Sequence, residues 1–398
     1  MRARPCADAP RLLGLRALGV GLGLGLGDPP HATAGPGPDG APHGRLPDPA
    51  LLRIHPEDVL DVLDRLPKST DRPEPPGDPP PVTDPAPARH SPGRTVGTDP
   101  HRQPDEDGPE HPPIGVVIAT RDRADSLAVT LRHLLALPEK PPVLVADNAS
   151  SDGTRAMIAE QFPEVRVLAL PANRGALARN DGVRALDTPY VAFSDDDSWW
   201  EPGALTTAAR LLDAHPRLGL LSARTLVGPS DAPDPLNDFL AGSPLGPATD
   251  LPGNQVLGFL GCAAVARRSA YLDAGGYHRL LFFGAEETLL AYDLAARGWG
   301  VVHCPEVVAH HHPAPVPRAH RSAVVHRNEL LTTWLRRPLP VALRRTWDLA
   351  TAARRDPEAR RALSAALALL PAALRARTPL PPYIERAVRQ VEGASRER

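Results

Sequence analysis

The middle of the chain alternates between short apolar runs and longer amphipathic stretches. Residues 114–119 and 142–146 are apolar runs of strand length, and residues 122–137 between them carry apolar side chains at helical spacing. Two further runs, at residues 164–170 and 190–193, follow with helical segments between them. Strands that alternate with helices at this spacing predict an α/β fold, with a mostly parallel sheet flanked by helices.

The regions on either side of this segment follow other patterns. Residues 28–113 are dominated by Pro, Gly, Asp, His and Arg, so we expect them to be mostly disordered, apart from a short amphipathic helix at residues 51–66. Beyond Arg318, helical segments rich in arginine continue to Val391. The sequence therefore divides into a low-complexity N-terminal region (1–112), an α/β domain (113–317) and a basic helical C-terminal extension (318–398).

Composition narrows the classes of function. The net charge of −2 gives no electrostatic reason to expect nucleic acid as a partner. The 3 cysteines are far apart and odd in number, which argues against a disulfide framework and favours a reducing cytosol. The apolar stretch at residues 12–27 is interrupted by Arg16 and is shorter than the ~20 residues of a membrane span. We therefore expect a cytoplasmic protein that is neither exported nor membrane-spanning.

Polar residues follow each predicted strand, at the edge of the sheet where α/β proteins bind ligands. Thr120–Arg123, after the first strand, is by itself an ordinary loop and helix start. Asp147–Thr154, after the second, offers short acceptors to a base or ribose, and equally fits a simple helix cap. After the third strand, Asn173–Gly175 precedes a helix with Arg179, which could bind a phosphate or lie on the helix surface.

The fourth strand has the most informative ending. Asp195–Asp197 places three carboxylates together, and a cation such as Mg²⁺ or Mn²⁺ that also binds substrate phosphates would offset their repulsion. Further along, Glu286–Glu287 open a predicted helix, where they either cap it or act as a general base. One of His310–His312 could complete a metal site. At least one of Trp199 and Trp200 is expected in the hydrophobic core.

Together these motifs resemble family 2 glycosyltransferases with the GT-A fold, over residues 113–313. Each motif is weak alone, but their order and spacing are those of the family. The matching segments are Val116–Arg123, Asp147–Thr154, Asn173–Gly175, Arg179–Asn180, Tyr190–Asp197, Gly275–Tyr277, Glu286–Glu287, Arg297–Trp299 and the strand that ends in His310–His312.

The resemblance implies a role for each candidate site residue. Asp195 and Asp197 would be the outer members of the family's DxD motif, and with His311 they are the expected ligands of a Mn²⁺ or Mg²⁺ cofactor. Glu287 is the expected catalytic base, where the family usually has Asp, and Glu286 is the alternative. The residues expected to bind the nucleotide-sugar are Thr120, Asp147, Asn148, Asn173, Arg179, Asp195 and Asp196.

The implied reaction moves a sugar, with inversion, from a nucleoside-diphosphate sugar to a hydroxyl of a glycan, lipid-linked or small-molecule acceptor, in cell-envelope glycan biosynthesis. Three alternatives stay open. A sugar nucleotidyltransferase would be expected to have a Gly-rich loop after the first strand, and a metal-dependent phosphohydrolase leaves residues 147–154 unexplained. The third is a non-catalytic carbohydrate-binding module. The basic extension is either a solvated cap or a peripheral contact with the inner face of a membrane.

Overall fold

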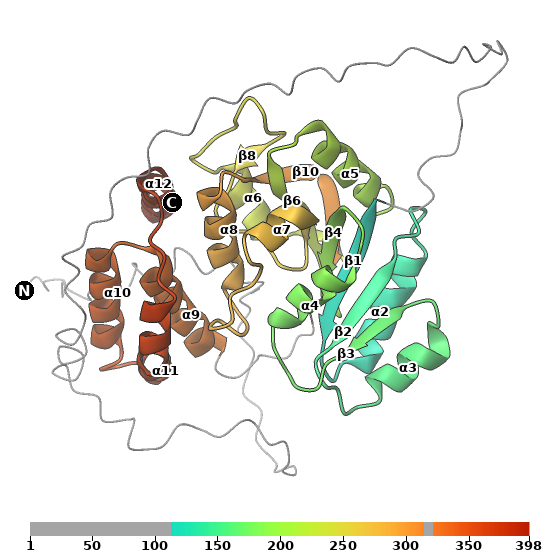
Figure 1. Cartoon of the computed structure of the whole chain (residues 1–398), viewed down its shortest axis with the longest axis horizontal. Helices are drawn as coiled ribbons and strands as arrows, with labels where there is room; N and C mark the ends of the chain where they lie inside the picture. The colour runs from blue at the N-terminus through green and yellow to red at the C-terminus, as the bar shows by residue number, and fades with distance from the viewer. Residues whose placement is uncertain (1–112, 314–320, 398) are drawn as a thin grey trace, which may run out of the picture. The chain divides into compact units, whose positions relative to one another are not determined.

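The computed structural model describes residues 113–313 and 321–397, so the helix predicted at residues 51–66 and the predicted disordered region lie outside the described residues. The described chain is built on one sheet with helices on both of its faces (Figure 1). Its strands are β1 (Ile114–Thr120), β2 (Val143–Asp147), β3 (Arg166–Ala169), β4 (Tyr190–Ser194), β5 (Ser198–Trp200), β6 (Leu218–Val227), β7 (Ala232–Pro233), β8 (Asn254–Gln255), β9 (Ala264–Arg267) and β10 (Gly300–His311).

The strand order is β3-β2-β1-β4-β9-β6-β10-β5, with β7 paired to β6 and β8 paired to β10. The first four strands pair in parallel, as predicted, and β6 and β10 also run parallel to each other. Between these two groups β9 runs antiparallel to both β4 and β6. The predicted α/β class is therefore confirmed, with a sheet that is parallel over its first half and mixed over its second.

The strands alternate their side chains between two apolar layers. In β1, Val116 and Ile118 pack in the same cluster as Leu127 and Leu131 of α2, whereas Val117 belongs to the cluster on the opposite face. Both faces are covered, which explains why the parallel strands are continuous apolar runs. The helices of this part are α2 (Ala124–Leu135), α3 (Thr154–Gln161), α4 (Leu177–Ala185), α5 (Ala204–Ala214), α6 (Pro235–Ala241), α7 (Arg268–Asp273) and α8 (Glu286–Ala296).

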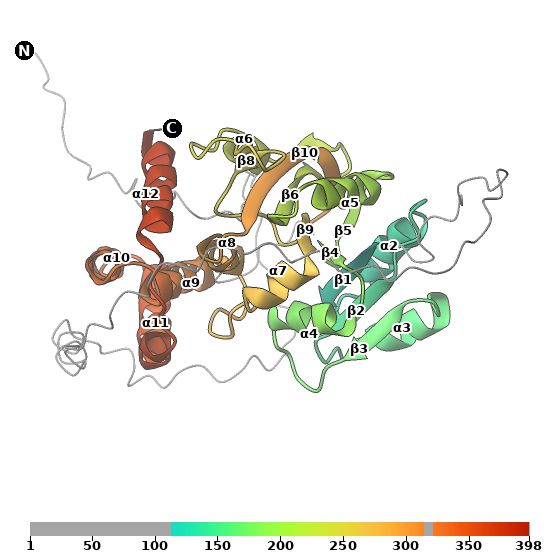
Figure 2. The ribbon, with the colours of Figure 1, turned by 45° about the horizontal axis from the view of Figure 1, so that its top comes forward.

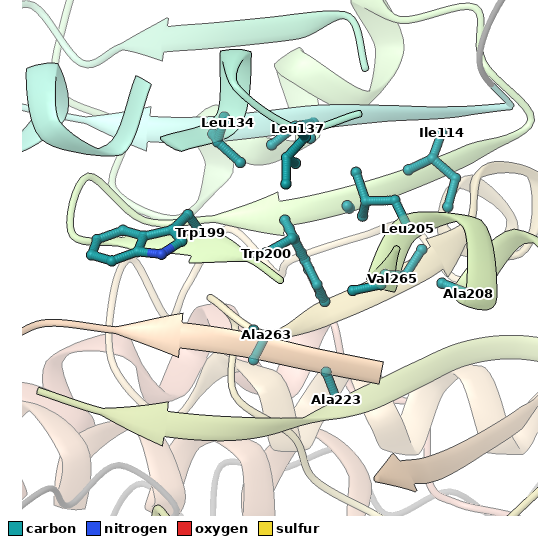
Figure 3. Close-up of a cluster of buried hydrophobic side chains, with 14 of the residues drawn as sticks. Ile114, Leu134, Leu137, Trp199, Trp200, Leu205, Ala208, Ala223, Ala263 and Val265 are labelled. Atoms are coloured by element: carbon teal, nitrogen blue, oxygen red, sulfur yellow. The ribbon is translucent and has the colours of Figure 1, made fainter. Parts of the chain in front are cut away.

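The two adjacent tryptophans of β5 have different surroundings. Trp200 is 1% exposed and stands among the other labelled side chains of the cluster in Figure 3, beside Leu205. Trp199 lies at the side of that cluster, and its ring stacks on His133 of α2 with 4.0 Å between ring centroids. Both tryptophans therefore belong to the core, which agrees with the expectation that at least one does, and Trp199 also lies next to histidines.

The C-terminal part consists of four helices. These are α9 (Arg321–Arg336), α10 (Leu339–Ala352), α11 (Pro357–Arg375) and α12 (Pro382–Glu397). The prediction of a helical extension is thus confirmed for the described residues. Both α9 and α12 contact α8 (Figure 2), and Arg336 of α9 donates to both carboxylate oxygens of Asp293 on α8 at 2.5 and 2.9 Å. None of the described helices is both long and apolar enough to cross a membrane.

Candidate active site

The carboxyl ends of the first parallel strands bring three predicted residues together. The backbone N–H of Asn148, just after β2, donates to the carbonyl of Thr120 at the end of β1, at 2.9 Å. The Thr120 hydroxyl donates in turn to Oδ2 of Asp196, just after β4, at 3.1 Å. Side chains from three separate segments therefore meet at one edge of the sheet, as the strand pattern predicted.

The loops after β1 and β2 are tied to each other by carboxylates that accept from backbone N–H groups. Asp147 is completely buried, and its carboxylate accepts from the N–H of Ser150 at 3.2 Å. Asp122 accepts from the N–H of Ser151 at 2.6 Å, and this backbone hydrogen bond lowers the pKa of the Asp122 carboxyl. Asp152 accepts from the N–H of Ala124, the first residue of α2, at 3.1 Å. The predicted nucleotide residue Asp147 thus turns its carboxylate toward its own loop and fixes that loop's shape.

Asn148 and Asn173 hold the loop that leads to α4. The side chain of Asn148 accepts from the N–H of Arg174 at 2.9 Å and donates to the carbonyl of Gly175 at 3.2 Å, while Asn173 accepts from the N–H of Gly175 at 2.9 Å. Gly175 has φ +59°, and a Cβ there would come within 2.2 Å of the carbonyl oxygen of Phe282. Only glycine fits this crossing, which brings the loop before α8 next to the strand ends.

The three aspartates of the DxD segment have separate partners. Asp195 is ion-paired with Arg179 of α4, whose side chain is buried. Asp196 accepts from Arg123 Nε at 3.2 Å, in addition to Thr120. Asp197 lies 3.4 Å from Arg123 Nη2 and 3.5 Å from His311 Nε2. Of the three predicted metal ligands, the structure thus joins Asp197 and His311, and it pairs Asp195 with an arginine.

The crowding of these carboxylates changes how they hold protons. Burial, together with the charges of Asp195 and Asp197, raises the pKa of Asp196 to about 6, and Arg123 and Thr120 lower it only in part. Burial alone would lower the pKa of His311, but the Asp197 carboxylate that faces it raises the pKa above its usual value. Asp196 and His311 therefore both hold their protons more tightly than the same groups do in water.

The acidic pair at the start of α8 lies against the same group of charges. Glu286 is buried, and burial together with the adjacent Glu287 raises its pKa well above the usual range. Burial also raises the pKa of Glu287, which interacts with Arg179. A Cβ on Gly261 would lie 2.9 Å from Glu287 Oε1 and 3.3 Å from the Tyr277 hydroxyl oxygen, so this glycine leaves the room that the carboxylate occupies.

Three contributors to the site had no assigned role from the sequence. Arg123 looked like an ordinary loop residue, yet it contacts two aspartates of the triplet. Buried Asn180 accepts from the Tyr277 N–H and donates to the Tyr277 carbonyl, both at 2.9 Å, and so fixes the Gly276–Tyr277 turn beside Arg179. Gly261 carried no local signal at all. These roles depend on contacts between residues far apart in the sequence.

The donor set fits a hard divalent cation. Carboxylate oxygens with one imidazole are suitable ligands for Mn²⁺ or Mg²⁺, and Asp197 and His311 already face each other. After burial, the charges of Asp195 and Asp197 are the next causes of the raised pKa of Asp196, and a bound cation would offset this repulsion. The residues that would hold such an ion are Asp195, Asp197 and His311.

Comparisons with known sequences point to one family. Residues 115–274 match the sequence model of glycosyl transferase family 2. An N-acetylglucosaminyl-diphospho-decaprenol L-rhamnosyltransferase of Mycobacterium tuberculosis is 27% identical over 276 residues, which cover 58% of this chain and 89% of that enzyme. A pre-mycofactocin glycosyltransferase of the same organism is 30% identical over 216 residues, which cover 52% of this chain and 44% of that enzyme.

Solved structures give matches of the same kind. The mannosyltransferase PcManGT from Pyrobaculum calidifontis, in complex with GDP-Man and Mn²⁺, is 21% identical with a TM-score of 0.44, covering 74% of this chain and 90% of that one. S. aureus TarS 1–349, in complex with UDP-GlcNAc, is 15% identical with a TM-score of 0.42, covering 71% of this chain and 91% of that one.

Proposed function

The chain belongs, through residues 115–274, to glycosyl transferase family 2, as its motifs predicted, and on that premise we propose which reaction its site performs. It is an enzyme that transfers sugars from nucleotide-sugar donors. We propose that it is divalent-metal dependent, inverts the configuration of the sugar, and uses a hydroxyl of a lipid-linked glycan as acceptor. The observation that carries the proposal is the position of Glu287 and the aspartate triplet around Arg179, which interacts with both.

We assign nucleotide binding and cation binding to different residues of the site. Thr120, Asn148 and Asn173 line the predicted nucleotide side of the site, and Arg123 brings positive charge beside the triplet. Asp195, Asp197 and His311 would hold the cation, which when bound supplies electrostatic stabilisation to the departing diphosphate. Of the other residues predicted for the donor, Arg179 is paired with Asp195, Asp196 accepts from Thr120 and Arg123, and Asp147 acts through the loop it shapes.

Glu287 is the proposed general base. Its raised pKa makes it a stronger proton acceptor than an ordinary carboxylate, which suits removal of a proton from a sugar hydroxyl. The acceptor oxygen would attack the anomeric carbon as its proton passes to Glu287 and the bond to the diphosphate breaks. A single displacement of this kind gives inversion. Glu286 is more deeply buried, and its Oε2 has no hydrogen-bond partner among the described residues, so it is the weaker candidate.

A lipid-linked acceptor is supported by two observations. The rhamnosyltransferase relative carries a lipid-diphosphate sugar in its name. Phe282 and Phe283, in the loop before Glu286, are 43% and 39% exposed and would give a lipid portion an apolar surface near the base. With such an acceptor the enzyme would work in cell-envelope glycan synthesis, at the cytoplasmic face of the membrane. We also propose that residues 113–317 form the catalytic domain and that the basic extension 318–398 is a separate addition to it.

The test is a panel of nucleotide-sugars that includes activated rhamnose, with a lipid-diphosphate glycan acceptor and release of nucleoside diphosphate as the readout. We expect release from one donor with Mn²⁺ or Mg²⁺ and loss of release with EDTA. The Asp197→Asn variant should lose at least about 100-fold in turnover, whereas Asp125→Asn, an exposed aspartate on α2, should not change it. Full turnover of Asp197→Asn in EDTA would remove the cation from the mechanism, and no release from any donor would favour the non-catalytic binding module.

A further inference from the structure

A second group of metal-binding side chains lies beside the active site, on the other face of β10. Among the described residues, Asp231, His310 and His312 each place one ligand atom within 4.8 Å of the others. Side chains alternate along a strand, so His310 faces away from the side on which His311 meets Asp197, and His312, just after β10, contacts the same Trp199 ring as His310. The group is therefore distinct from the predicted donor cation site.

The three residues come from segments whose positions the backbone fixes. Asp231 is at the tip of the β6–β7 hairpin, where its N–H donates to the carbonyl of Gly228 at 3.1 Å, and the N–H of Gly228 donates to the carbonyl of His311 at 3.0 Å. The N–H of His312 donates to the carbonyl of Asp197 at 2.7 Å. The candidate ligands thus sit on a preformed frame.

His310 already has the environment of a metal-bound histidine. Its Nδ1 lies 2.9 Å from Oδ1 of Asp231, and its Nε2 lies 2.5 Å from Oε2 of Glu201. In many protein metal sites, one imidazole nitrogen binds the ion while the other donates to a carboxylate that orients the ring. Here Nδ1 and Asp231 face the candidate ion position, and Glu201 would be the orienting carboxylate.

The surroundings leave room for an ion with an open coordination position. A cavity of about 360 Å³ is lined by the three residues together with His133 and Trp199. The Trp199 ring lies 4.5 Å from the His312 ring, between centroids, and so restricts how His312 can turn. Two imidazoles and one carboxylate are a donor set that favours Zn²⁺ and similar transition metals over Mg²⁺.

We propose that Asp231, His310 and His312 bind a Zn²⁺-class transition metal ion, with Glu201 as the orienting carboxylate, separately from the cation of the donor site. A bound ion would join the β6–β7 hairpin to the end of β10. Because His311 stands between two of the ligands, and His312 is bonded to the backbone of Asp197, the ion would also hold in place the strand ends that carry the donor-site residues.

The experiment uses the full chain in the Asp197→Asn background, which weakens the donor site, after chelator treatment and dialysis. Zn²⁺ is titrated calorimetrically, and Co²⁺ is used in parallel because its visible absorption reports imidazole ligation. Asp231→Asn keeps the shape of the side chain, and Glu201→Gln removes only the orienting charge. His215→Ala is the matched control, because this histidine caps the C-terminal end of α5 and its ring contacts the carbonyl of Asp250.

We expect Asp231→Asn and His312→Ala to bind one Zn²⁺ fewer per chain than their parent, and Glu201→Gln to bind it about 10–100-fold more weakly. His215→Ala should match the parent, and Zn²⁺ should raise the thermal midpoint of the parent but not that of Asp231→Asn.

Equal Zn²⁺ binding by the parent, Asp231→Asn and Glu201→Gln would overturn the proposal. Loss of all Zn²⁺ binding in the Asp197→Asn parent, with retention in the wild type, would assign the ion to the donor site instead. Neither result depends on glycosyltransferase activity, so failure here is distinguishable from failure of the proposed reaction.

Discussion

Two buried groups of charged residues in this protein differ in how completely their polar atoms are hydrogen-bonded. In the C-terminal helices, Arg337 donates from Nε to Glu385 at 2.6 Å and from Nη1 to Glu392 at 2.8 Å, and Arg345 adds a further bond to Glu392 at 3.0 Å. Around Arg179 the hydrogen bonding is incomplete. Its Nε, the hydroxyl of Tyr277 and Oε2 of Glu286 are buried without a hydrogen-bond partner among the described residues.

The difference supports our proposal that the Arg179 group is a binding site. Buried polar atoms in folded proteins are normally hydrogen-bonded, and a group with several exceptions is either strained or waiting for a ligand. The Arg337 group is complete, so it needs nothing further and acts as a structural link between helices. The Arg179 group gathers carboxylates with raised pKa values beside a predicted donor site, which is the pattern expected of catalytic machinery.

The largest expected effect comes from neutralising the proposed base. Glu287→Gln should reduce kcat about 10²–10⁴-fold, because the acceptor hydroxyl loses its proton acceptor, while the affinity for the nucleotide-sugar changes little. Steady-state kinetics with saturating donor, together with calorimetric donor binding, would measure both. Glu286→Gln is the matched comparison one residue away and should lose far less. If Glu286→Gln is the inactive variant and Glu287→Gln is not, the base is Glu286.

The second prediction compares how substitution of Arg337 and substitution of Arg179 change stability and donor binding. Arg337→Met should lower the free energy of unfolding by about 3 kcal/mol, because Glu385 and Glu392 lose the buried guanidinium that joins them and keep only Arg389 and Arg345 as partners. Arg179→Met should cost less stability, since its partner Asp195 is 30% exposed and can be solvated, but it should weaken donor binding or turnover. Urea unfolding and donor titrations on both variants are the measurement. Equal losses of stability, with donor binding intact in Arg179→Met, would remove the distinction between the two groups.

The parallel strands could be predicted from the sequence better than the antiparallel strand and the long-range contacts of the site. The parallel strands β1, β2 and β4 are apolar runs because both of their faces are covered, so their positions and the polar residues at their ends could be predicted. The antiparallel strand β9 is only 4 residues long and ends in Arg267, so it has no such signature, and the end of β10 at His310–His312 could be predicted only through the order of the family's motifs. At the site, Arg123 and Gly261 could not be predicted, because their importance comes from contacts with Asp196 and Glu287, far along the chain.

The smallest expected effect concerns a buried carboxylate outside both groups. Burial raises the pKa of Glu329 on α9 to about 7, and Arg345 lowers it only in part. Since the folded pKa lies above the unfolded value, the protonated form stabilises the fold, and this contribution is present below about pH 4.5 and lost as the pH rises through 7. Glu329→Gln should therefore be more stable than the wild type by about 1–2 kcal/mol near pH 8, with the difference shrinking toward pH 5.

Urea unfolding of Glu329→Gln at several pH values would measure this dependence, with the exposed Glu164→Gln as the control that should show none. A pH-independent difference would mean that Glu329 is ionised in the fold and compensated by a cation, as Glu392 is. Glu329 on α9 would then be paired as fully as the carboxylates around Arg337 are. Of these buried charged groups, only the Arg179 group would have polar atoms without hydrogen-bond partners among the described residues. A pH-dependent difference would show instead that an unpaired buried carboxylate can simply cost stability. The case for the Arg179 group as a site would then rest on its position at the strand ends and on the kinetics of Glu287→Gln.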